Sequence, residues 1–391
     1  MKIAIDAIPF MTPKTGVGYY TYNLISEFLK IAPQNSYYLC DVLIGRIFYN
    51  MYRLEDVSSL NYFSNYFANI SKMPFPFNGL IWALLSQHAK ATGKTAKIKL
   101  EDADIFFGTN FRGIFKETLK TVITIHDMAH EYYPEATSKR IFNYLKKLQR
   151  SAEKADLIIA DSENTKKDVE KILNIPNEKI KVIYLGVDPI FRPINDKDVL
   201  DPIRRKYNIY EKFILYVGAI QPRKNIATLI RAYSMLCKEQ NFEHKLVIAG
   251  GVGWKNKNIR PLIEELKLKD KIIFTGYISE HDLPAIYNLS DAFVFPSLYE
   301  GFGLPVLEAM ACGVTVVTSN VSSLPEVAGD AALLINPHSI EDLADGIRRI
   351  LHDEGLRKKN IAKGLEQAKL FTWEKCARET LDVFSQALSQ K

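Results

Sequence analysis

The chain has 391 residues, of which 47% are hydrophobic and 25% are charged, and its formal net charge is +6. This composition is ordinary for a globular protein and argues against disorder, collagen and coiled coil, while the length suggests two domains. No apolar run approaches the ~20 residues that a membrane-spanning helix needs, and so mild a basic excess does not indicate a nucleic-acid partner. Four scattered cysteines fit buried thiols in a reducing compartment, so we expect a cytoplasmic protein.

Apolar runs and amphipathic stretches alternate along the first part of the chain. Helices are predicted over residues 19–31 and 139–154. Buried strands are predicted over residues 3–7, 37–44, 105–107, 122–126 and 157–160. Apolar, β-branched strands that alternate with helices are typical of a parallel sheet buried on both faces.

A second series of the same kind follows. Its predicted helices include residues 226–239, 304–312 and 340–352, and a last helix is predicted over residues 374–388. Its predicted strands are residues 213–217, 246–249, 272–275, 292–295, 314–318 and 332–335. Prolines and clustered charges without an apolar period predict a linker over residues 191–204. We therefore expect an α/β protein with one doubly wound domain over residues 1–190 and another over residues 205–372.

The segment of residues 296–313 joins two predicted strands of the second domain. Gly301 and Gly303 leave little side-chain bulk before its predicted helix, whose free N–H groups and positive dipole end would suit a phosphate. Ligands of open α/β sheets bind beyond the carboxyl ends of strands, where this loop lies. Glu300 precedes the helix and Glu308 lies inside it, so the two could reach neighbouring groups of one ligand. The alternative is an ordinary glycine loop with two surface glutamates.

A second loop, residues 216–225, follows the first strand of the second domain. Arg223 and Lys224 project from this loop, and an arginine fork beside a lysine point charge suits a diphosphate. The alternative is a solvated basic loop. Gly218 and Asn225 argue against that alternative, because a tight turn and a helix cap would hold the loop in a fixed shape.

Together these residues resemble the retaining glycosyltransferases of family 4, over nearly the whole chain. Glu300 and Glu308, with seven residues between them, are similar to the family's E-x7-E motif, and Gly218 followed by Arg223-Lys224-Asn225 resembles its diphosphate-binding loop. Residues 320–332 and 371–373 also look like the family. The resemblance implies the GT-B fold, in which two Rossmann-like domains face across a cleft. It also implies that the last helix, within residues 373–391, crosses back to the first domain.

The resemblance implies a role for each of these side chains. Arg223 and Lys224 would hold the donor diphosphate and stabilise the charge that develops as the nucleotide leaves. Glu308 would accept hydrogen bonds from the ribose hydroxyls, and Glu300 would lie beside the transferred sugar. The other implied donor-binding residues are Gly218 and, through their amides, Phe302, Gly303 and Leu304.

The first domain would supply the acceptor side. Gly16-Val17-Gly18 resembles the family's first glycine-rich loop, which lies against donor phosphates or acceptor, although a plain turn is the alternative. His126 and Asp127 end a predicted strand. His126 could contact the sugar as a catalytic residue, and Asp127 could orient His126 or the acceptor. The alternative is a polar pair satisfied by nearby backbone.

Two D-x-D sequences raise the question of a metal. Asp102 and Asp104 lead into a strand, and Asp196 and Asp198 lie in the predicted linker, so neither pair has the context of a metal site. The resemblance also implies metal independence. We expect no metal and no cofactor other than the nucleotide-sugar donor as co-substrate.

Residues 57–100 contain lysines and many aromatic side chains but no acidic residue. Such a segment could lie on an anionic membrane surface and meet a lipid-linked acceptor, which would make the protein peripheral on the inner face of the membrane. The basic residues of the following predicted helix would extend that surface: Lys139, Arg140, Lys146, Lys147 and Arg150. The alternative is that the aromatic side chains form core and the lysines face solvent.

The function expected from these observations is transfer of a sugar onto a polysaccharide or a lipid-linked oligosaccharide. Likeness around residues 126–135 and 321–332 favours a mannosyltransferase that uses GDP-mannose, and a UDP-sugar donor is the alternative. A nicotinamide-dependent oxidoreductase lacks its glycine fingerprint here. A UDP-sugar epimerase would not need Arg223 and Lys224 together with the two glutamates. A non-catalytic GT-B scaffold is the remaining alternative.

Overall fold

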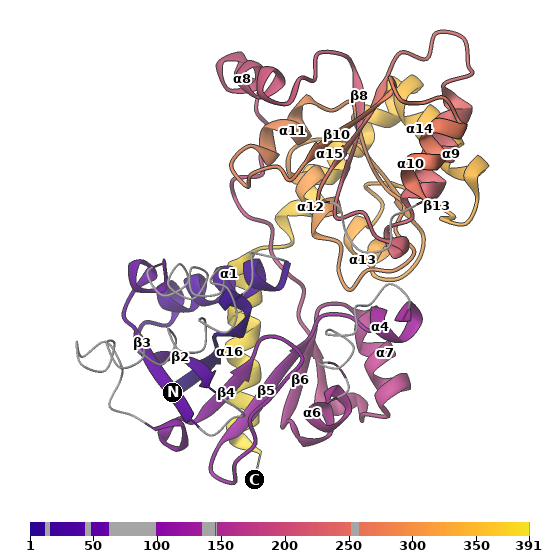
Figure 1. Cartoon of the computed structure of the whole chain (residues 1–391). Helices are drawn as coiled ribbons and strands as arrows, with labels where there is room; N and C mark the ends of the chain where they lie inside the picture. Colours follow the sequence, from indigo (N-terminus) through magenta and orange to yellow (C-terminus); the bar gives the residue numbers. More distant parts are fainter. Residues whose placement is uncertain are drawn as a thin grey trace. The chain divides into compact units, whose positions relative to one another are not determined.

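The computed structural model describes residues 1–11, 16–43, 48–61, 99–134, 145, 147–251 and 258–390. The chain divides into two compact units, and each has its own sheet (Figure 1). The first unit comprises Met1–Asp127, Asn143–Gly186 and Trp373–Lys391. The second comprises Met128–Phe142 and Val187–Thr372.

The stretch 191–204, for which the sequence predicted a linker, groups with the second unit. Its backbone is bound there, because the Ile194 N–H donates to Asn288 Oδ1 at 2.7 Å and the Asn288 amide donates to the Arg192 carbonyl at 2.9 Å. The stretch also contains the start of helix α8 (Lys197–Tyr207), which is capped by Asp196 and has no buried residue. Its polar composition therefore reflects a surface helix of the second unit.

The sheet of the first unit has seven strands in the order β3-β2-β1-β4-β5-β6-β7. All neighbours are parallel except β2 and β3, so β3 is an antiparallel edge strand. The edge strands β3 and β7 were not predicted, because β3 mixes polar and apolar residues and β7 has only three residues. The strands are β1 (Lys2–Asp6), β2 (Ser36–Leu43), β3 (Phe48–Leu54), β4 (Ile105–Gly108), β5 (Lys120–Ile125), β6 (Leu157–Ala160) and β7 (Ile180–Val182).

One face of this sheet is covered by α1 (Gly16–Ile31) and α16 (Trp373–Ser389), which pack against each other. The Phe384 ring of α16 lies 5.0 Å from Phe107 of β4 and 5.9 Å from Phe28 of α1, centroid to centroid. The prediction that the last helix returns to the first domain is confirmed. The unit's other helices are η1 (Ile8–Met11), η3 (Leu100–Asp102), α6 (Leu148–Lys154), α7 (Glu163–Leu173) and η5 (Asn177–Lys179).

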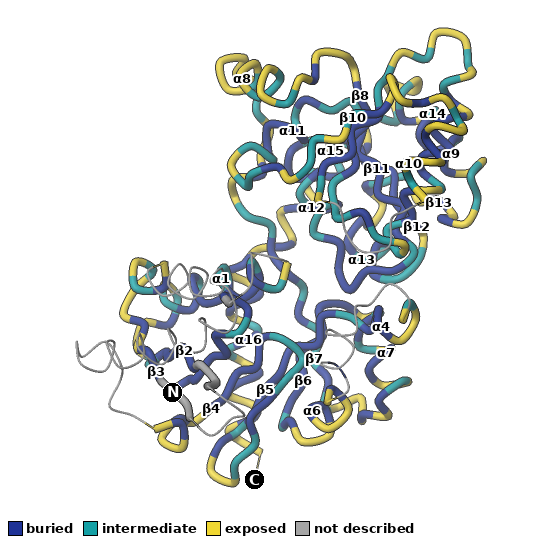
Figure 2. Tube along the Cα trace, in the orientation of Figure 1, coloured by how far each residue is buried: buried dark blue, intermediate teal, exposed yellow. Residues whose placement is uncertain are grey.

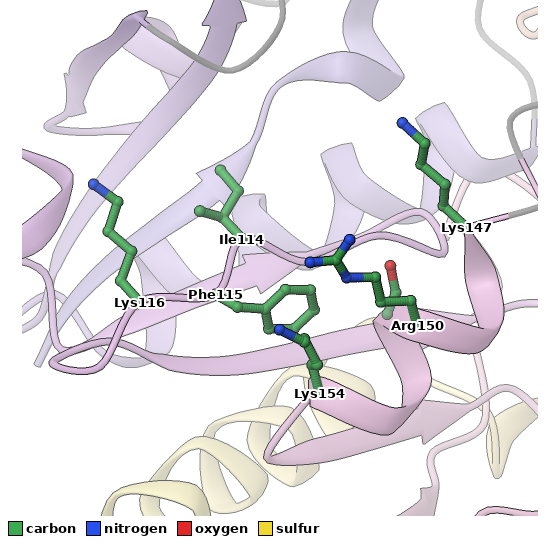
Figure 3. Close-up of a pocket in the computed structure, with 7 residues that line it drawn as sticks. Ile114, Phe115, Lys116, Lys147, Arg150 and Lys154 are labelled. Atoms are coloured by element: carbon green, nitrogen blue, oxygen red, sulfur yellow. The ribbon is translucent and has the colours of Figure 1, made fainter.

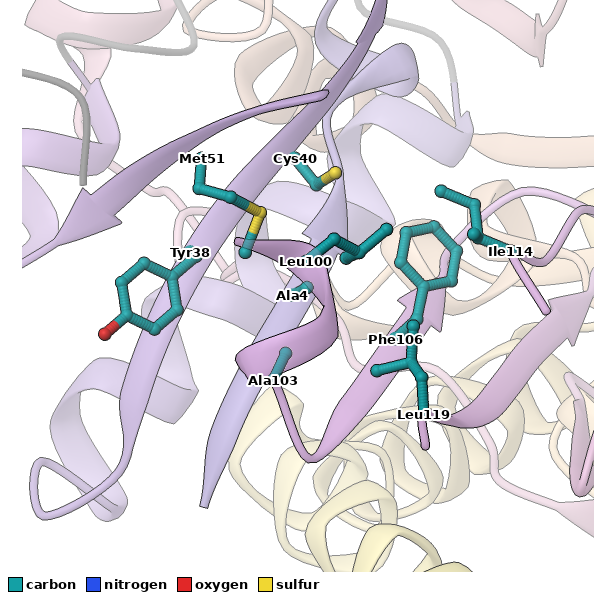
Figure 4. Packing of buried hydrophobic residues seen from close by; sticks show 9 residues of the cluster. All are labelled: Ala4, Tyr38, Cys40, Met51, Leu100, Ala103, Phe106, Ile114 and Leu119. Carbon is teal, nitrogen blue, oxygen red and sulfur yellow. The ribbon is translucent and has the colours of Figure 1, made fainter. Parts of the chain in front are cut away.

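The opposite face carries a separate apolar cluster (Figure 4). Ala4 pairs with Tyr38 on one side and Phe106 on the other, so these three side chains share a face of the sheet. Met51 of β3 and Leu100 of η3 extend the cluster. Both faces of the sheet are therefore buried, as the near-continuous apolar strands predicted.

The second sheet has six strands, all parallel, in the order β10-β9-β8-β11-β12-β13. Its central strands are fully buried and its helices expose their outer sides (Figure 2). The sequence predicted all six strands within two residues of their observed bounds. The strands are β8 (Phe213–Val217), β9 (Lys245–Ala249), β10 (Ile272–Gly276), β11 (Ala292–Phe295), β12 (Val316–Ser319) and β13 (Leu333–Ile335).

Helices cover both faces of the second sheet, with α9, α10 and α14 on one side and α11 and α12 on the other (Figure 1). Helix α15 packs on α12 and was not predicted, because its buried residues are only Asn360, Gly364 and Ala368. The helices are α4 (Ala129–Tyr132), η6 (Pro222–Lys224), α9 (Ile226–Leu236), α10 (Ile259–Glu265), α11 (Leu283–Leu289), α12 (Leu304–Ala311), α13 (Leu324–Ala328), α14 (Ile340–His352) and α15 (Glu354–Lys369).

Some predictions fall on residues outside the described ranges. These are most of the aromatic, basic segment 57–100 and, in the predicted helix 139–154, Lys139, Arg140 and Lys146; the described part of that helix is α6. Within the described ranges, no helix combines the length and the apolar character needed to cross a membrane.

Candidate functional site

The loop that follows β8 is shaped by Gly218 and Asn225. Gly218 has φ +152°, and a Cβ atom there would lie 2.7 Å from the Tyr216 hydroxyl, so a side chain does not fit. Asn225 is left-handed, with φ +59°, and occupies the N-cap position of α9. Its side chain does not cap the helix, contrary to the prediction, because its amide instead donates to the Pro337 carbonyl at 2.6 Å. That bond still fixes the loop, as the sequence suggested.

Between these two residues, η6 presents Arg223 and Lys224 to Glu300. Arg223 Nη1 donates to Glu300 Oε2 at 2.9 Å, and Lys224 Nζ donates to Glu300 Oε1 at 2.5 Å. Arg223 Nη1 also donates to the Tyr299 carbonyl at 2.9 Å. The predicted cations and the first predicted glutamate therefore meet beyond the carboxyl ends of the neighbouring strands β8 and β11.

The Glu300 carboxylate is stabilised by these two cations. Burial would raise the pKa of Glu300, but the charges of Lys224 and Arg223 outweigh burial and lower that pKa to about 2. Glu300 is therefore ionised at neutral pH, and two cations with one carboxylate leave a net positive charge. The side chains of Arg223 and Lys224 stay 20% and 12% exposed, so both still reach the surface.

The Glu300 loop is held by two serines that the sequence did not single out. Ser322 Oγ accepts from the Glu300 N–H at 3.1 Å and donates to the Glu300 carbonyl at 2.5 Å. Ser323 Oγ lies 2.9 Å from the Glu300 carbonyl and 2.7 Å from the Phe302 carbonyl. Both serines lie in the segment 320–332 that resembled the family, so that segment braces the backbone of the candidate site.

Helix α12 begins directly after this loop. Gly303 occupies its N-cap position with φ +119°, and a Cβ atom there would lie 2.8 Å from Leu324 Cδ2. The backbone N–H groups of Gly303 and Leu304 therefore lie at a helix amino end, where the dipole favours an anion.

Glu308, the second predicted glutamate, lies one turn into α12 in a different environment. Tyr287 Oη, which is fully buried, donates to Glu308 Oε2 at 2.8 Å. Burial raises the pKa of Glu308 to about 7; the tyrosine bond opposes this, while the nearby acids Glu280 and Asp188 add to it. The two glutamates thus have opposite electrostatic character, and only Glu300 is held ionised by cations.

In the first unit, His126 follows β5 and both of its ring nitrogens have protein partners. Nδ1 lies 2.7 Å from Asp161 Oδ2, and Nε2 lies 2.8 Å from the Thr109 carbonyl. Nε2 must donate, because a carbonyl only accepts. Burial lowers the pKa of His126, but the Asp161 carboxylate outweighs burial and raises it. These contacts fit the alternative of a satisfied strand-end pair, and contact of His126 with a sugar stays a prediction.

Gly16, Val17 and Gly18 form the first turn of α1 rather than a loop before it. A Cβ atom at Gly16 would meet no atom within 4 Å, so open space lies beside this residue. Tyr20, one turn further, lies edge-on to the His126 ring at 4.9 Å between centroids. The structure therefore brings the glycine turn and His126 to one region of the first unit, with half-buried Asp127 next in the chain.

The segment after Asp127 belongs to the second unit and contacts the residue before Glu300. The Met128 N–H donates to Tyr299 Oη at 3.1 Å, and the Tyr132 ring lies 5.2 Å from the Tyr299 ring. Part of the segment 126–135 that resembled the family therefore packs against the Glu300 loop.

Three of the four D-x-D acids accept hydrogen bonds from backbone amides. Asp102 accepts from Lys99, Asp104 from Lys2, and Asp196 from Asp198. In the part of the chain that the structure describes, no group of three or more His, Cys, Asp or Glu side chains is arranged to hold a metal ion.

Sequence reasoning missed several residues of these clusters. Asp161 carried a usable signal, because it directly follows the predicted strand 157–160 beside the strand that ends at His126. Tyr287, Ser322 and Ser323 carried none, because their partners lie more than twenty residues away in sequence.

Comparison with known families matches both units. The family described as Glycosyl transferases group 1 matches residues 201–367, and Glycosyltransferase Family 4 matches residues 55–191. The first match spans β8 to α15 and includes the whole Arg223–Lys224–Glu300 cluster.

Individual proteins agree with the family matches. The chain is 32% identical over 389 residues to O-antigen chain mannosyltransferase B of Escherichia coli, covering 98% of this chain and 99% of that protein. It is 37% identical to serotype-specific mannosyltransferase WbdA of E. coli over 69% of this chain, but that match spans only 34% of the longer WbdA. Sucrose-phosphate synthase from Thermosynechococcus elongatus has the same fold, with a TM-score of 0.72 at 20% identity and full coverage of both chains. The chain therefore belongs to the group 1 glycosyl transferases, and it is a hexosyltransferase with the GT-B fold.

Proposed function

We propose that this enzyme transfers mannose from GDP-mannose onto a polysaccharide or a lipid-linked oligosaccharide, with retention of configuration and without a metal. The observation that carries the proposal is the joining of Arg223, Lys224 and Glu300 beyond β8 and β11. The choice of mannose is supported by the 32% identical relative, which is named an O-antigen chain mannosyltransferase.

The donor diphosphate would bind where Arg223 and Lys224 now meet Glu300. A diphosphate carries more negative charge than one carboxylate, so it would draw both cations toward itself. As the bond between the sugar carbon and the diphosphate oxygen breaks, negative charge accumulates on that oxygen. Two fixed cations and the amino end of α12 would stabilise this charge most strongly in the transition state.

Glu300 would lie beside the sugar carbon from which the diphosphate departs. Glu300 is ionised at neutral pH before the donor binds, because its pKa is about 2, and as a carboxylate it would stabilise the positive charge that develops on the sugar. The acceptor hydroxyl would attack from the face that the diphosphate leaves, and its proton would pass to the departing phosphate oxygen. Attack from that face retains the configuration of the sugar carbon.

The remaining residues would position the two substrates. Glu308 would accept from the ribose hydroxyls, Gly218 would leave room for the phosphates, and the amides of Phe302, Gly303 and Leu304 would face them. On the acceptor side we assign the turn Gly16–Gly18, which has open space beside it, together with His126 and Asp127.

In the proposed chemistry, side chains rather than a divalent cation neutralise the charge of the diphosphate. Arg223 and Lys224 supply two positive charges within reach of one diphosphate. The reaction should therefore proceed unchanged when divalent cations are chelated.

Segment 57–100 would bring the enzyme to its acceptor at a membrane. It has five lysines and no acidic residue, which suits an anionic surface. Co-sedimentation with anionic vesicles should weaken as salt rises, because salt screens such contacts. Equal failure to bind at low and high salt would contradict this part of the proposal.

The first experiment is thermal unfolding with GDP, UDP, ADP, dTDP and NAD, each with and without EDTA. A ligand at a hundredfold excess over its Kd raises the stability by about 2.7 kcal/mol. We expect only GDP to raise the unfolding temperature, and we expect this rise to be the same with EDTA present. A response to UDP instead would make a UDP-sugar the donor, and no response to any diphosphate would contradict the donor-binding roles of Arg223, Lys224 and Glu308. Transfer from labelled GDP-mannose, followed by NMR of the new anomeric linkage, tests retention.

A further inference from the structure

A basic cavity lies in the first unit between α6 and the segment that precedes β5. Its volume is about 330 Å³, which falls in the range of small-ligand pockets. Its lining combines the cationic side chains of Lys116, Lys147, Arg150 and Lys154 with the apolar side chains of Ile114 and Phe115 and with Ser151. Figure 3 shows Lys147, Arg150 and Lys154 projecting from the same helix, with Ile114 and Phe115 on the neighbouring segment.

Three of the four cations are not neutralised by their surroundings. Lys116 pairs with Glu101, whereas Lys147, Arg150 and Lys154 are exposed and form no ion pair with an acid of the described ranges. Asp156, the nearby acid after α6, is engaged by Lys120 at 3.0 Å and by the Thr121 N–H at 2.7 Å. The cavity wall therefore carries an excess of positive charge.

The cavity is separate from the predicted acceptor residues of the same unit. The Thr121 hydroxyl donates to the Ile114 carbonyl at 2.6 Å, which ties the cavity lining to the start of β5. His126 lies beyond the other end of β5. A strand rises ~3.3 Å per residue, so the five residue steps from Thr121 to His126 correspond to roughly 16 Å. A ligand in the cavity would not occupy the transfer site.

The geometry points to a second anion site, and we infer that this cavity binds the phosphate group of a ligand that also has an apolar part. Arg150 offers a planar fork and the lysines offer mobile point charges, which together suit a phosphate better than a single carboxylate. Ile114 and Phe115 would contact the carbon atoms next to that phosphate. A phospholipid headgroup and a soluble phosphate compound share this chemistry.

The test compares two double variants that each remove two lysines from one helix of the first unit. Lys147→Ala/Lys154→Ala removes cations of the cavity, and Lys167→Ala/Lys171→Ala removes the same charge from α7, away from the cavity. Thermal unfolding with GDP should give the same response in both variants, which shows that the fold and the second unit are intact.

Two probes distinguish the sources of the phosphate. In the lipid arm, the proteins bind vesicles of phosphatidylcholine that contain phosphatidylglycerol. In the soluble arm, inorganic phosphate is titrated while the unfolding temperature is followed. Each cation near an anionic surface contributes roughly fivefold to binding, so the cavity variant should bind the vesicles about thirtyfold more weakly than wild type. The α7 variant should bind them like wild type.

Each outcome decides the inference. Loss of vesicle binding in the cavity variant alone supports the site with a lipid headgroup as its source. Suppose that only the cavity variant loses the rise in unfolding temperature with phosphate, while its vesicle binding is unchanged. That result supports the site with a soluble phosphate compound as its ligand. Equal behaviour of the two variants with both probes overturns the inference, and so does failure of wild type to respond to either probe.

Discussion

The two units each place a buried carboxyl group beside a basic side chain at the carboxyl end of a strand, yet the two clusters differ. In the second unit, Glu300 is held by Arg223 and Lys224, which remain partly exposed. In the first unit, His126 is enclosed by Asp161, the Thr109 carbonyl and the Tyr20 ring.

The difference shows that position at a strand end does not by itself indicate a ligand site. The cations of the second unit can exchange Glu300 for a more highly charged group, because they reach the surface. Both nitrogens of His126 are occupied within the protein. We therefore expect substitutions in the first cluster to affect stability foremost and those in the second to affect catalysis.

The largest effect is expected from Lys224→Ala. Loss of one group that stabilises a developing oxyanion lowers kcat by about 10²–10³-fold, and the far-UV spectrum should stay unchanged. Initial rates of transfer from GDP-mannose measure this. Lys212→Ala is the matched control, since Lys212 is exposed next to the opposite end of β8. A rate for Lys224→Ala within a few-fold of the control would remove Lys224 from the mechanism.

Asp161→Asn should lower the free energy of unfolding by roughly 3 kcal/mol, because it removes the buried carboxyl partner of His126 Nδ1. Asp156→Asn is the control, since its pair with Lys120 at the other end of β5 is partly exposed and contributes about 0–1 kcal/mol. Denaturant unfolding measures both. If His126→Asn abolished transfer while unfolding as wild type does, the contrast between the clusters would be wrong and the acceptor-side role proposed for His126 would be supported.

The stabilisation that each cluster contributes should depend on pH in opposite directions. The folded pKa of Glu300 is lowered to about 2, so its stabilisation is present above the unfolded value of about 4.3 and is lost as pH falls toward 2. The folded pKa of His126 is raised, so its stabilisation is present below about 6.5 and is lost as pH rises through the folded value. Unfolding across pH 2–8 measures both. Glu300→Gln should reduce the loss of stability in acid, to which other carboxylates of lowered pKa such as Asp282 also contribute, and should leave the His126 dependence unchanged.

The smallest effect is expected from Tyr287→Phe. Its hydroxyl favours the ionised form of Glu308, so its removal should raise the pKa of Glu308 above its value of about 7. If the Glu308 carboxylate binds ribose, the KM for donor should show the same alkaline shift while kcat at high pH is unchanged. If the pH dependence of the KM for donor did not change, Tyr287 would have a structural role only. Tyr233→Phe, at a buried tyrosine bonded to backbone carbonyls, is the control.

Much of the fold was predictable because local patterns carried it. Apolar strands buried on both faces alternate with amphipathic helices, so the parallel sheets followed from periodicity. Among the elements that escaped prediction are the edge strands β3 and β7 and helix α15, whose exposed or small side chains leave no such period.

The amino-acid sequence by itself determined the two strand–helix series and the candidate donor residues, because each of those signals lies within one short segment. Only the tertiary structure decided that Arg223, Lys224 and Glu300 meet, that Glu308 pairs with Tyr287 and that His126 is enclosed by Asp161. These pairings depend on which strands are neighbours in a sheet. Charge, burial and pKa then follow from contacts between segments far apart in the chain, which no local pattern records.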